Sequence, residues 1–517
     1  MSLGISVEIH SGPPAIYQVK PKEKKIDSLT RLSVGEIDLN RTNRTILLVG
    51  ETGAGKSSLI NALFNYTMGV KFEDEVWFQI VAEEERSQTE SQTSDVIVYD
   101  IFGFEGQTLP FSLTIIDTPG FGDTRGQERD EEVAERLLDL FGSEEGVHQV
   151  NAVGVVMKAT DNRLTDRLRY VLDSVTSLFG KNLEDKIVVL VTHSDGRKPV
   201  NVLKAVKETE IKCAKNEENQ IIHFLFNNCQ HEDRRNDREF LELADQTSMK
   251  GLKNFMTFLE STKPQPLKIT AEVLNERIRL EACIQNLQER INENDLKQRE
   301  IRQIEKAYEN HEEEMKEHQN FTIEVDEVYK EKEPIDAGIC LVFYEGAVTC
   351  SVCEENCHYP GCTMAWYPGL CEVMNWGCCT VCTNKCPASD HVKEDWIYVI
   401  KTRNVQKTLE DLEEKYENNK EECEEKSSLL EKLKQENRNL EKERASLLDE
   451  AYSHVIKLEK IALKVESVST LVHLDFLIEK MKEKGDQEKV KNLEEMKSRV
   501  SEGTNAALRY AKNLSSE

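Results

Sequence analysis

Apolar and polar residues follow three different patterns along the chain, and each predicts a different kind of structure. Residues 42–263 alternate short β-branched runs with amphipathic helical segments. This pattern predicts a mostly parallel sheet with helices on both faces, an α/β fold. The second and third strands are joined by a short connection, so we expect them to form an antiparallel hairpin at one edge. Strands are expected at 45–50, 96–101, 112–116, 151–158, 186–192 and 221–226.

Two long stretches without Gly or Pro follow, at 267–332 and 397–464. Both carry apolar residues at alternating steps of three and four, which is typical of a coiled coil. Because the stretches are nearly equal in length, we expect an antiparallel helical hairpin with the segment between them at its tip. The alternative is two independent helices that pair with other chains. The seam of the first stretch is Leu280, Ile284, Leu287 and Ile291.

The remaining segments differ in composition from these two regions. Residues 1–41 are polar, and we expect an extension with at most one short strand. Residues 338–396 form a cysteine-rich insert between the two long stretches. Residues 465–517 predict a helical tail, with amphipathic segments at 471–484, 488–500 and 506–514.

Composition and charge exclude several classes of function. The 517 residues carry a net charge of −28, which argues against an extended nucleic-acid footprint, because phosphate binding needs a surplus of Lys and Arg. No apolar run approaches the roughly 20 residues of a transmembrane helix, and the chain does not begin with a basic segment leading into an apolar one. We therefore expect a cytoplasmic protein with no transmembrane segment.

One eight-residue segment fits the pattern G-x-x-x-x-G-K-[ST] and lies between a predicted strand and a predicted helix at 58–65. The glycines let backbone N–H groups wrap a phosphate, and the helix presents the positive end of its dipole. Lys56 can reach the β- and γ-phosphates, and Ser57 can ligate Mg²⁺; both are expected to act in catalysis. The expected phosphate-binding residues are Gly50, Glu51, Thr52, Gly53, Ala54, Gly55, Lys56, Ser57 and Ser58.

Two further motifs extend this candidate site. Asp117 follows the strand at 112–116 and begins D-T-P-G, so we expect its carboxylate to support Mg²⁺ and the N–H of Gly120 to meet the γ-phosphate. A buried strand then ends in T-H-S-D, where Asp195 can accept hydrogen bonds from N1 and N2 of guanine. This favours GTP over ATP. The expected base-binding residues are Thr192, His193, Asp195, Asn227 and Asn228.

These motifs together resemble the septin and paraseptin GTPases, the latter comprising the Toc import receptors and the immune-associated GIMAP proteins. The run D-T-P-G-F-G-D is septin-like, and T-H-S-D is closer to the Toc and GIMAP side, where a His stands against the base. The resemblance implies a P-loop GTPase fold with GTP or GDP and Mg²⁺. It also implies a switch threonine that binds Mg²⁺ and senses the γ-phosphate. Thr93 is the first choice, and Thr89 stays open.

The residue after D-x-x-G shapes the expected mechanism. Ras-type enzymes hold a water-orienting Gln there, and this chain has Phe121, so we expect slow intrinsic hydrolysis on the order of 10⁻⁴ to 10⁻² s⁻¹. In the related families, pairing of two G domains completes or regulates the site. The resemblance therefore implies that the chain binds itself through its G domain.

Ten of the 14 cysteines fall between Cys340 and Cys386, which in a reducing compartment favours metal over disulfides. The unit C-x-x-C-x-x-x-C occurs twice, as Cys350, Cys353, Cys357 and as Cys379, Cys382, Cys386. Two C-x-x-C pairs can hold one structural Zn²⁺. A second ion would take Cys357, His358 or Cys362, Cys386 and His391, with Cys340, Cys371 and Cys378 as possible substitutes.

The sequence leaves three functions open. The first is a GTP-regulated assembly protein whose coiled coil and zinc module bind other subunits or an unidentified protein partner. The second is a monomeric signalling switch. The third is a zinc-dependent adaptor or ubiquitin ligase with a structural G domain. A RING-type ligase would have a His between its C-x-x-C pairs, and this chain lacks that His with its spacing. For the cysteines, a set of buried thiols or a redox switch are the alternatives to zinc.

Overall fold

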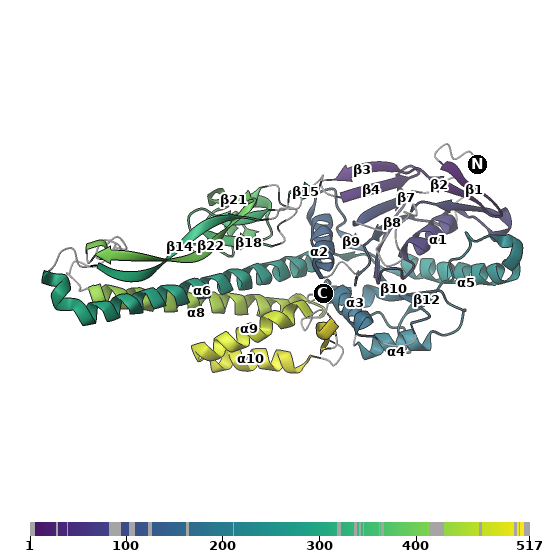
Figure 1. The fold of residues 1–517 in the computed structure, drawn as a ribbon. Coiled ribbons are helices and arrows are strands. Elements are labelled where there is room, and N and C mark those ends of the chain that lie inside the picture. Colours follow the sequence, from purple (N-terminus) through teal and green to yellow (C-terminus); the bar gives the residue numbers. More distant parts are fainter. Residues whose placement is uncertain are drawn as a thin grey trace. The chain divides into compact units, whose positions relative to one another are not determined.

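The computed structural model divides the chain into two compact units, shown as a ribbon in Figure 1. The first unit consists of Met1–Leu274, Leu458–Val472 and Glu495–Glu517, and the second of Asn275–Lys457 and His473–Glu494. The structure describes residues 6–26, 29–38, 40–81, 95–102, 109–122, 127–161, 165–209, 211–317, 322–335, 339–340, 343–344, 346–360, 362, 365, 367–408, 410–412, 429–464, 468–500, 504–505 and 507–510.

An eight-stranded sheet, in the order β12-β11-β10-β5-β8-β7-β4-β3, forms the centre of the first unit. All six strands expected from the sequence are present, and β12 through β8 run parallel to one another, so the α/β prediction is confirmed. β7 and β8 pair antiparallel as expected, but two further strands cover β7, so the edge position predicted for this hairpin is wrong. The strands are β3 (Lys22–Ile26), β4 (Leu29–Val34), β5 (Asn43–Gly50), β7 (Ile97–Ile101), β8 (Ser112–Asp117), β10 (Ala152–Lys158), β11 (Ile187–Thr192) and β12 (His223–Leu225).

The N-terminal residues are not the polar extension that the sequence predicted. They supply four strands: β3 and β4 extend the large sheet, while β1 (Ser6–Ser11) and β2 (Ala15–Val19) form a second sheet with β6 (Val76–Gln79). β3 has the sequence Lys-Glu-Lys-Lys-Ile and lies at the edge of its sheet. Charged side chains on an edge strand oppose pairing with other chains. Because β3 is such a strand, its composition resembles that of a loop.

The central strands of this sheet are buried on both faces. Ile46 and Leu48 of β5 belong to a core with α1 (Lys56–Met68) and α5 (Arg234–Ser261), whereas Leu47 and Val49 point to the opposite face and are equally buried. α3 (Asp166–Ser177) contacts β5 as well. Because β5, β8, β10, β11 and β12 are parallel, their carboxyl ends lie along one edge of the sheet.

The other elements of the first unit connect these layers. They are η1 (Phe72–Asp74), α2 (Gln127–Gly142), β9 (Gln149–Val150), η2 (Lys181–Lys186), α4 (Val200–Glu208) and β13 (Gln265–Pro266), which pairs with β9.

Two long helices run antiparallel in the second unit, α6 (Lys268–Glu317) and α8 (Leu429–Ile461) (Figure 1). Asn294 of α6 donates to the carbonyl of Leu440 on α8, and Glu276 near the start of α6 contacts His454 near the end of α8. All four seam residues expected on α6 are buried. α9 (Val468–Lys484) and α10 (Gln487–Ser498) follow, close to the helices expected at 471–484 and 488–500. The helix expected at 506–514 lies largely outside the described residues.

The helical prediction is wrong for residues 322–332 and 397–408. β14 (Thr322–Pro334) and β22 (Trp396–Thr408) form an antiparallel ribbon along their full lengths. Ile323, Val325 and Glu327 are buried, while the residues between them are exposed, which is the period of a strand. The high charge of this segment hid that period in the sequence.

The cysteine-rich insert therefore lies at a different place from the one expected. The ribbon of β14 and β22 runs back along α6, and the insert packs against Ala282 and Asn286 in the first half of that helix. The prediction that the insert forms the tip of a helical hairpin is therefore wrong. Its elements are β15 (Ile339–Cys340), β16 (Phe343–Tyr344), β17 (Ala347–Cys350), β18 (Glu355–His358), η3 (Pro368–Leu370), β19 (Met374–Asn375), β20 (Cys378–Cys379), η4 (Ala388–Asp390) and β21 (His391–Glu394).

A buried carboxylate ties the two long helices together. Glu276 has a side chain that is 2% exposed, and it accepts hydrogen bonds from His454 Nδ1 at 2.9 Å and from Lys457 Nζ at 2.7 Å. Arg279, one turn further along α6, lies 3.1 Å away. Burial alone would raise the pKa of Glu276, but the bonds from His454 and Lys457 outweigh it and lower the pKa to about 2.

The substitution Glu276→Gln is expected to lower the free energy of unfolding by about 1–2 kcal/mol at pH 7, with the half-exposed Lys457 limiting the loss. A carboxylate whose pKa is lowered by folding stabilises the fold above its unfolded pKa, and this contribution disappears as the pH falls through the folded pKa. The difference between the two proteins should therefore narrow between about pH 4.5 and about pH 2. Denaturant unfolding measures it, with Glu441→Gln, an exposed position of α8, as the control.

Candidate functional site

The residues expected to bind phosphate form a tight loop between β5 and α1. The loop backbone takes left-handed conformations at Gly53 and Gly55, with φ of 73° and 92°. A β-carbon on Gly50 would meet the carbonyl oxygen of Val156 at 2.5 Å, and one on Gly120 would lie 2.4 Å from Cα of Thr52. These contacts explain why small residues stand at these places. They also leave the loop backbone open to a ligand.

The start of α1 leaves its backbone donors available. Gly55 is the N-cap and makes no side-chain cap, and the first turn carries no acidic residue. The first N–H groups of a helix have no partner within the helix, and they lie at the positive end of its dipole. Ser57 and Ser58 belong to this first turn and are partly buried. The hydroxyl of Thr52 is buried without a hydrogen-bond partner. This donor set fits a phosphate group.

Lys56 is folded back over the loop. Its Nζ donates to the carbonyl oxygen of Gly50 at 3.0 Å and to that of Glu51 at 3.3 Å, and the side chain is buried. Burial lowers the pKa of Lys56 to about 8, although Asp117 and Glu51 act to raise it. An ammonium group held in this way is poised to gain an anionic partner.

The D-T-P-G segment lies directly beside the loop. Asp117 and Thr118 are fully buried, and the Thr118 hydroxyl donates to the carbonyl of Leu48 on β5 at 2.9 Å. Phe121 pairs with the loop, because its N–H donates to Gly50 and its carbonyl accepts from Thr52. The Phe121 side chain is 1% exposed, which leaves it no means of holding a water molecule. Ser57 and Asp117 are the described residues suited to Mg²⁺, and Thr89 and Thr93 lie outside the described residues.

The residues expected to bind the base gather at the ends of β11 and β12. Thr192 donates from its hydroxyl to the carbonyl of Ala54 at 2.7 Å, which ties this loop to the phosphate loop. His193 has a left-handed backbone, with φ of 51°, and its Nδ1 lies 3.1 Å from the Thr192 hydroxyl. Asp195 is 71% exposed, and one of its oxygens accepts from the N–H of Arg197. Its other oxygen lies 3.8 Å from the Arg197 guanidinium.

Asn227 and Asn228 follow β12 and are both fixed by Ser248. The Ser248 hydroxyl accepts from the N–H of Asn227 and donates to the side chain of Asn228. The N–H of Ser194 donates to the carbonyl of Phe226, which joins the two loops. The structure therefore brings the phosphate loop, D-T-P-G, T-H-S-D and the two asparagines to one edge of the sheet.

Three charged residues that the sequence analysis did not assign to the site lie at the same edge: Lys158, Asp161 and Arg167. Lys158, the last residue of β10, has its ammonium beside Gly53, and its backbone N–H donates to Asp161. Arg167 of α3 forms an ion pair with Glu51 at 2.9 Å. Burial raises the pKa of Glu51, and Arg167 opposes this rise. The position of Lys158 at the carboxyl end of a buried strand was the one available signal.

The environment of His193 favours its neutral form. Burial lowers the pKa of His193, and the nearby Lys158 lowers it further, while Asp161 acts in the opposite direction. A neutral imidazole presents an aromatic face that can stack on a base without a charge of its own.

The cysteine-rich insert gathers its sulfur and imidazole atoms into three groups. Within each group, the potential ligand atoms lie no more than 4.8 Å apart. The groups are Cys350, Cys353, Cys382 and Cys386; Cys357, Cys379, Cys382 and His391; and His358, Cys362 and Cys371. Cys382 belongs to the first and the second group, whereas the third group shares no residue with them.

This grouping differs from the one expected from the spacing. The sequence placed both C-x-x-C pairs around one ion, whereas the structure exchanges Cys379 for Cys386 in that set. The exchange arises because Cys386 Sγ lies 3.7 Å from Cys353 Sγ. Cys371, expected only as a substitute, joins the third group, and Cys378 is exposed and outside all three. The side chain of Cys340 is not among those described.

The pKa values of Cys382 and His391 indicate which protons a metal ion would replace in the second group. Hydrogen bonds from Cys357 and Cys379 hold the pKa of Cys382 far below its usual value. Burial disfavours the charged form of His391, but its bonds to Cys379 and Cys382 raise the His391 pKa to about 10. A thiolate that neighbouring protons stabilise is suited to a divalent cation that takes their place.

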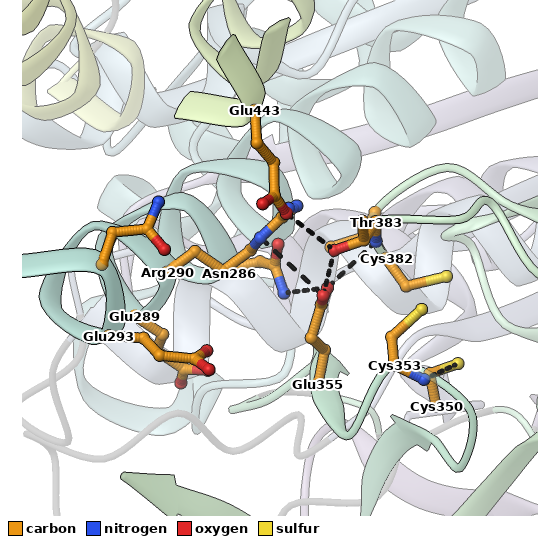
Figure 2. A network of polar contacts seen from close by, with 12 residues as sticks. Asn286, Glu289, Arg290, Glu293, Cys350, Cys353, Glu355, Cys382, Thr383 and Glu443 are labelled. Atoms are coloured by element: carbon orange, nitrogen blue, oxygen red, sulfur yellow. Dashed lines mark hydrogen bonds and ion pairs between the residues drawn. The ribbon is translucent and has the colours of Figure 1, made fainter. Parts of the chain in front are cut away.

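A buried polar network anchors this insert to both long helices (Figure 2). Glu355, two residues after Cys353, accepts from Asn286 of α6 at 3.2 Å and from the backbone N–H of Thr383 at 3.1 Å. Arg290 of α6 is 6% exposed and lies between Glu355 and Glu443 of α8, forming an ion pair with each. Thr383 directly follows Cys382, so the network fixes the chain next to the shared cysteine.

No described helix is both long and apolar enough to cross a membrane. Residues 44–248 match the model of the AIG1 family. GTP-binding protein A of Dictyostelium discoideum is 25% identical over 154 residues, which cover 30% of this chain and 29% of that protein. Human Septin-5 is 28% identical over 173 residues, covering 31% of this chain and 42% of its own length. The chain thus spans less than half the length of these curated relatives.

Among solved structures, Toc33 from Arabidopsis thaliana in complex with Mg²⁺ and GMPPNP is 19% identical, covers 44% of this chain and 88% of its own, and has a TM-score of 0.30. The family match confirms the resemblance that the motifs indicated. Residues 44–248 are therefore a GTP-binding G domain of the AIG1 family.

Proposed function

We propose that this protein is a GTP-regulated assembly protein with slow intrinsic hydrolysis, whose G domain pairs with that of a second copy. One observation supports the nucleotide site above all: the phosphate loop, Asp117 and Thr192 lie together at one edge of the sheet. The hydrogen bond from the Thr192 hydroxyl to the Ala54 carbonyl joins the two loops there. Ligands of open parallel sheets bind at this edge.

Phosphate binding rests on the loop donors and on Lys56. The N–H groups at the start of α1 face the anion, and the Lys56 ammonium exchanges its two carbonyl acceptors for phosphate oxygens. Ser57 and Asp117 are the residues that would hold Mg²⁺, which when bound neutralises charge on the phosphate oxygens. Thr93 completes this set in our proposal.

Base binding rests on the T-H-S-D loop. Asp195 is exposed and accepts a hydrogen bond from the backbone N–H of Arg197. In our proposal its carboxylate accepts from N1 and N2 of guanine. His193 offers a neutral ring to the face of the base, and Asn227 and Asn228 support the loop from the other side.

The buried Phe121 supports slow hydrolysis and a role for a second copy. Its side chain fills the core at the place where a water-orienting residue would stand. A partner G domain is the means by which the related families complete such a site. We propose self-association through the G domain, with the coiled coil of α6 and α8 and the cysteine-rich insert available to an unidentified protein partner.

The insert is proposed to be a structural zinc module. Seven residues of its first two groups would hold two ions that share the Cys382 thiolate, and six of the seven are buried. Thiolate and imidazole ligands suit Zn²⁺. Because Glu355 and Thr383 sit beside these ligands, the ions would stabilise the contact of the insert with α6 and α8.

The affinity for GTP should depend on the charge of Lys56. Its pKa is about 8 in the free protein, and a bound phosphate raises it, so affinity should be constant below pH 8 and fall by up to about tenfold per pH unit above it. Lys56→Ala should weaken binding about 10- to 100-fold and remove this dependence. Fluorescence titration with a labelled GTP analogue measures both, with the exposed Lys253→Ala as the control. Unchanged affinity in Lys56→Ala would contradict the site.

Guanine recognition should depend on Asp195. In Asp195→Asn the carboxamide presents a donor where guanine also donates, so GTP affinity should fall about 10- to 100-fold. Xanthosine triphosphate carries a carbonyl at C2 and should lose nothing, or gain. Competition titrations with the two triphosphates separate loss of the base contact from loss of folding, since a misfolded variant binds neither. Equal losses for both would show that Asp195 does not read the base.

Self-association predicts a GTPase rate that depends on protein concentration. The specific rate should rise about tenfold or more between nanomolar and tens of micromolar chain, as pairing completes the site. Phosphate release measured across this series tests the proposal, and light scattering in GTP, GDP and no nucleotide follows the mass. A flat specific rate with a constant mass would instead indicate a monomeric switch.

A further inference from the structure

The third group of the cysteine-rich insert lies apart from the two C-x-x-C units. His358 ends β18, and Cys362 and Cys371 lie in the segment that leads to β19. All three side chains are buried, with 5%, 1% and 3% exposure. Neither the repeated spacing nor the shared Cys382 accounts for this group, because it has no residue in common with the first two.

The distances within this group match those of a tetrahedral metal site. Two thiolates bound at about 2.3 Å to a tetrahedral ion lie about 3.8 Å apart, and a thiolate and an imidazole nitrogen lie about 3.5 Å apart. Cys362 Sγ and Cys371 Sγ are separated by 3.8 Å, and Cys371 Sγ lies 3.2 Å from His358 Nδ1. Both separations are close to those expected around one tetrahedral ion, and all three ligand atoms lie within 4.8 Å of one another.

A carboxylate lies close to the same nitrogen. Glu372 Oε2 is 3.5 Å from His358 Nδ1, and the Glu372 side chain is 10% exposed. Glu372 does not belong to the group whose ligand atoms all lie within 4.8 Å of one another, so its carboxylate is a neighbour of the His358 ring and not one of the ligands.

The surroundings of the group explain what an ion would do there. Arg279 of α6 donates from Nε to the backbone carbonyl of Glu372 at 2.9 Å, and from Nη2 to that of Met374. Ala282, one turn further, packs into the core that contains Cys362 and Cys371. The group thus lies where the segment after β18 meets α6, and an ion would close that segment into a loop against the helix.

We propose that His358, Cys362 and Cys371 form a separate site for one zinc ion. The site goes beyond the proposed function, because it requires neither nucleotide nor the ions of the first two groups. On binding, the metal replaces the protons of the two thiols, which leave to solvent, and no oxidation takes place. The alternative is a disulfide between Cys362 and Cys371, which would remove both ligands.

The test is the metal content of the full chain, purified under reducing conditions and measured by elemental analysis against protein mass. The Cys371→Ala variant should hold one zinc ion fewer per chain than the unaltered protein. Cys378→Ala removes an exposed cysteine outside all three groups and should leave the count unchanged. Equal zinc in Cys371→Ala and the unaltered chain would overturn the proposal.

The result is the difference in zinc content between the unaltered chain and Cys371→Ala, so it does not depend on the other two sites. If the two ions proposed to share Cys382 are absent, the unaltered chain holds one ion and Cys371→Ala none. If those two ions are present, the counts are three and two. Native mass spectrometry of the unaltered chain needs no variant to fold. Three ions in it support the third site, whereas a disulfide between Cys362 and Cys371 in the alkylated protein overturns it.

Discussion

The parallel register of β5 with β8 and β10 is the constraint on which the nucleotide site depends. It places the end of β5, and therefore the phosphate loop, between the ends of its two neighbours. Gly50 approaches the backbone of Val156, and Gly120 approaches that of Thr52, so closely that neither place has room for a β-carbon. Backbone packing thus fixes the loop before any ligand arrives, and the unpaired N–H groups of α1 remain for the phosphates.

The sequence was most informative where local pattern and chemistry agree. β5, β8, β10 and β11 are buried along nearly their whole length, so each appeared as a mostly apolar run, and the phosphate loop stood between β5 and a helix. Lys158 and Arg167 were not predictable in this way. Both are ordinary charged residues in the sequence. Their roles arise because the fold places the end of β10, with Lys158, beside Gly53, and α3, with Arg167, beside Glu51.

Prediction failed where charge concealed the period of a strand. β3 and β14 are rich in Lys and Glu because they lie at sheet edges or in a two-stranded ribbon, where one side of the strand meets water. β14 also shows how one wrong element displaces others: a helix there would carry the insert away from α6, whereas the ribbon brings it back to Ala282. The metal groups depend on this return path. Spacing alone gave the ligand types, but the partners of Cys386 and Cys371 are set by the tertiary fold.

The proposed function requires guanine nucleotide to occupy the phosphate loop, and the most direct measurement is of the nucleotide that the purified chain retains. The purified protein is denatured, and the released nucleotides are separated and quantified. The emptied and refolded chain is then titrated calorimetrically with GTP, with and without Mg²⁺. The account predicts release of GDP or GTP and a single site whose affinity for GTP requires Mg²⁺. Release of no guanine nucleotide, together with no magnesium-dependent heat of binding, would contradict it.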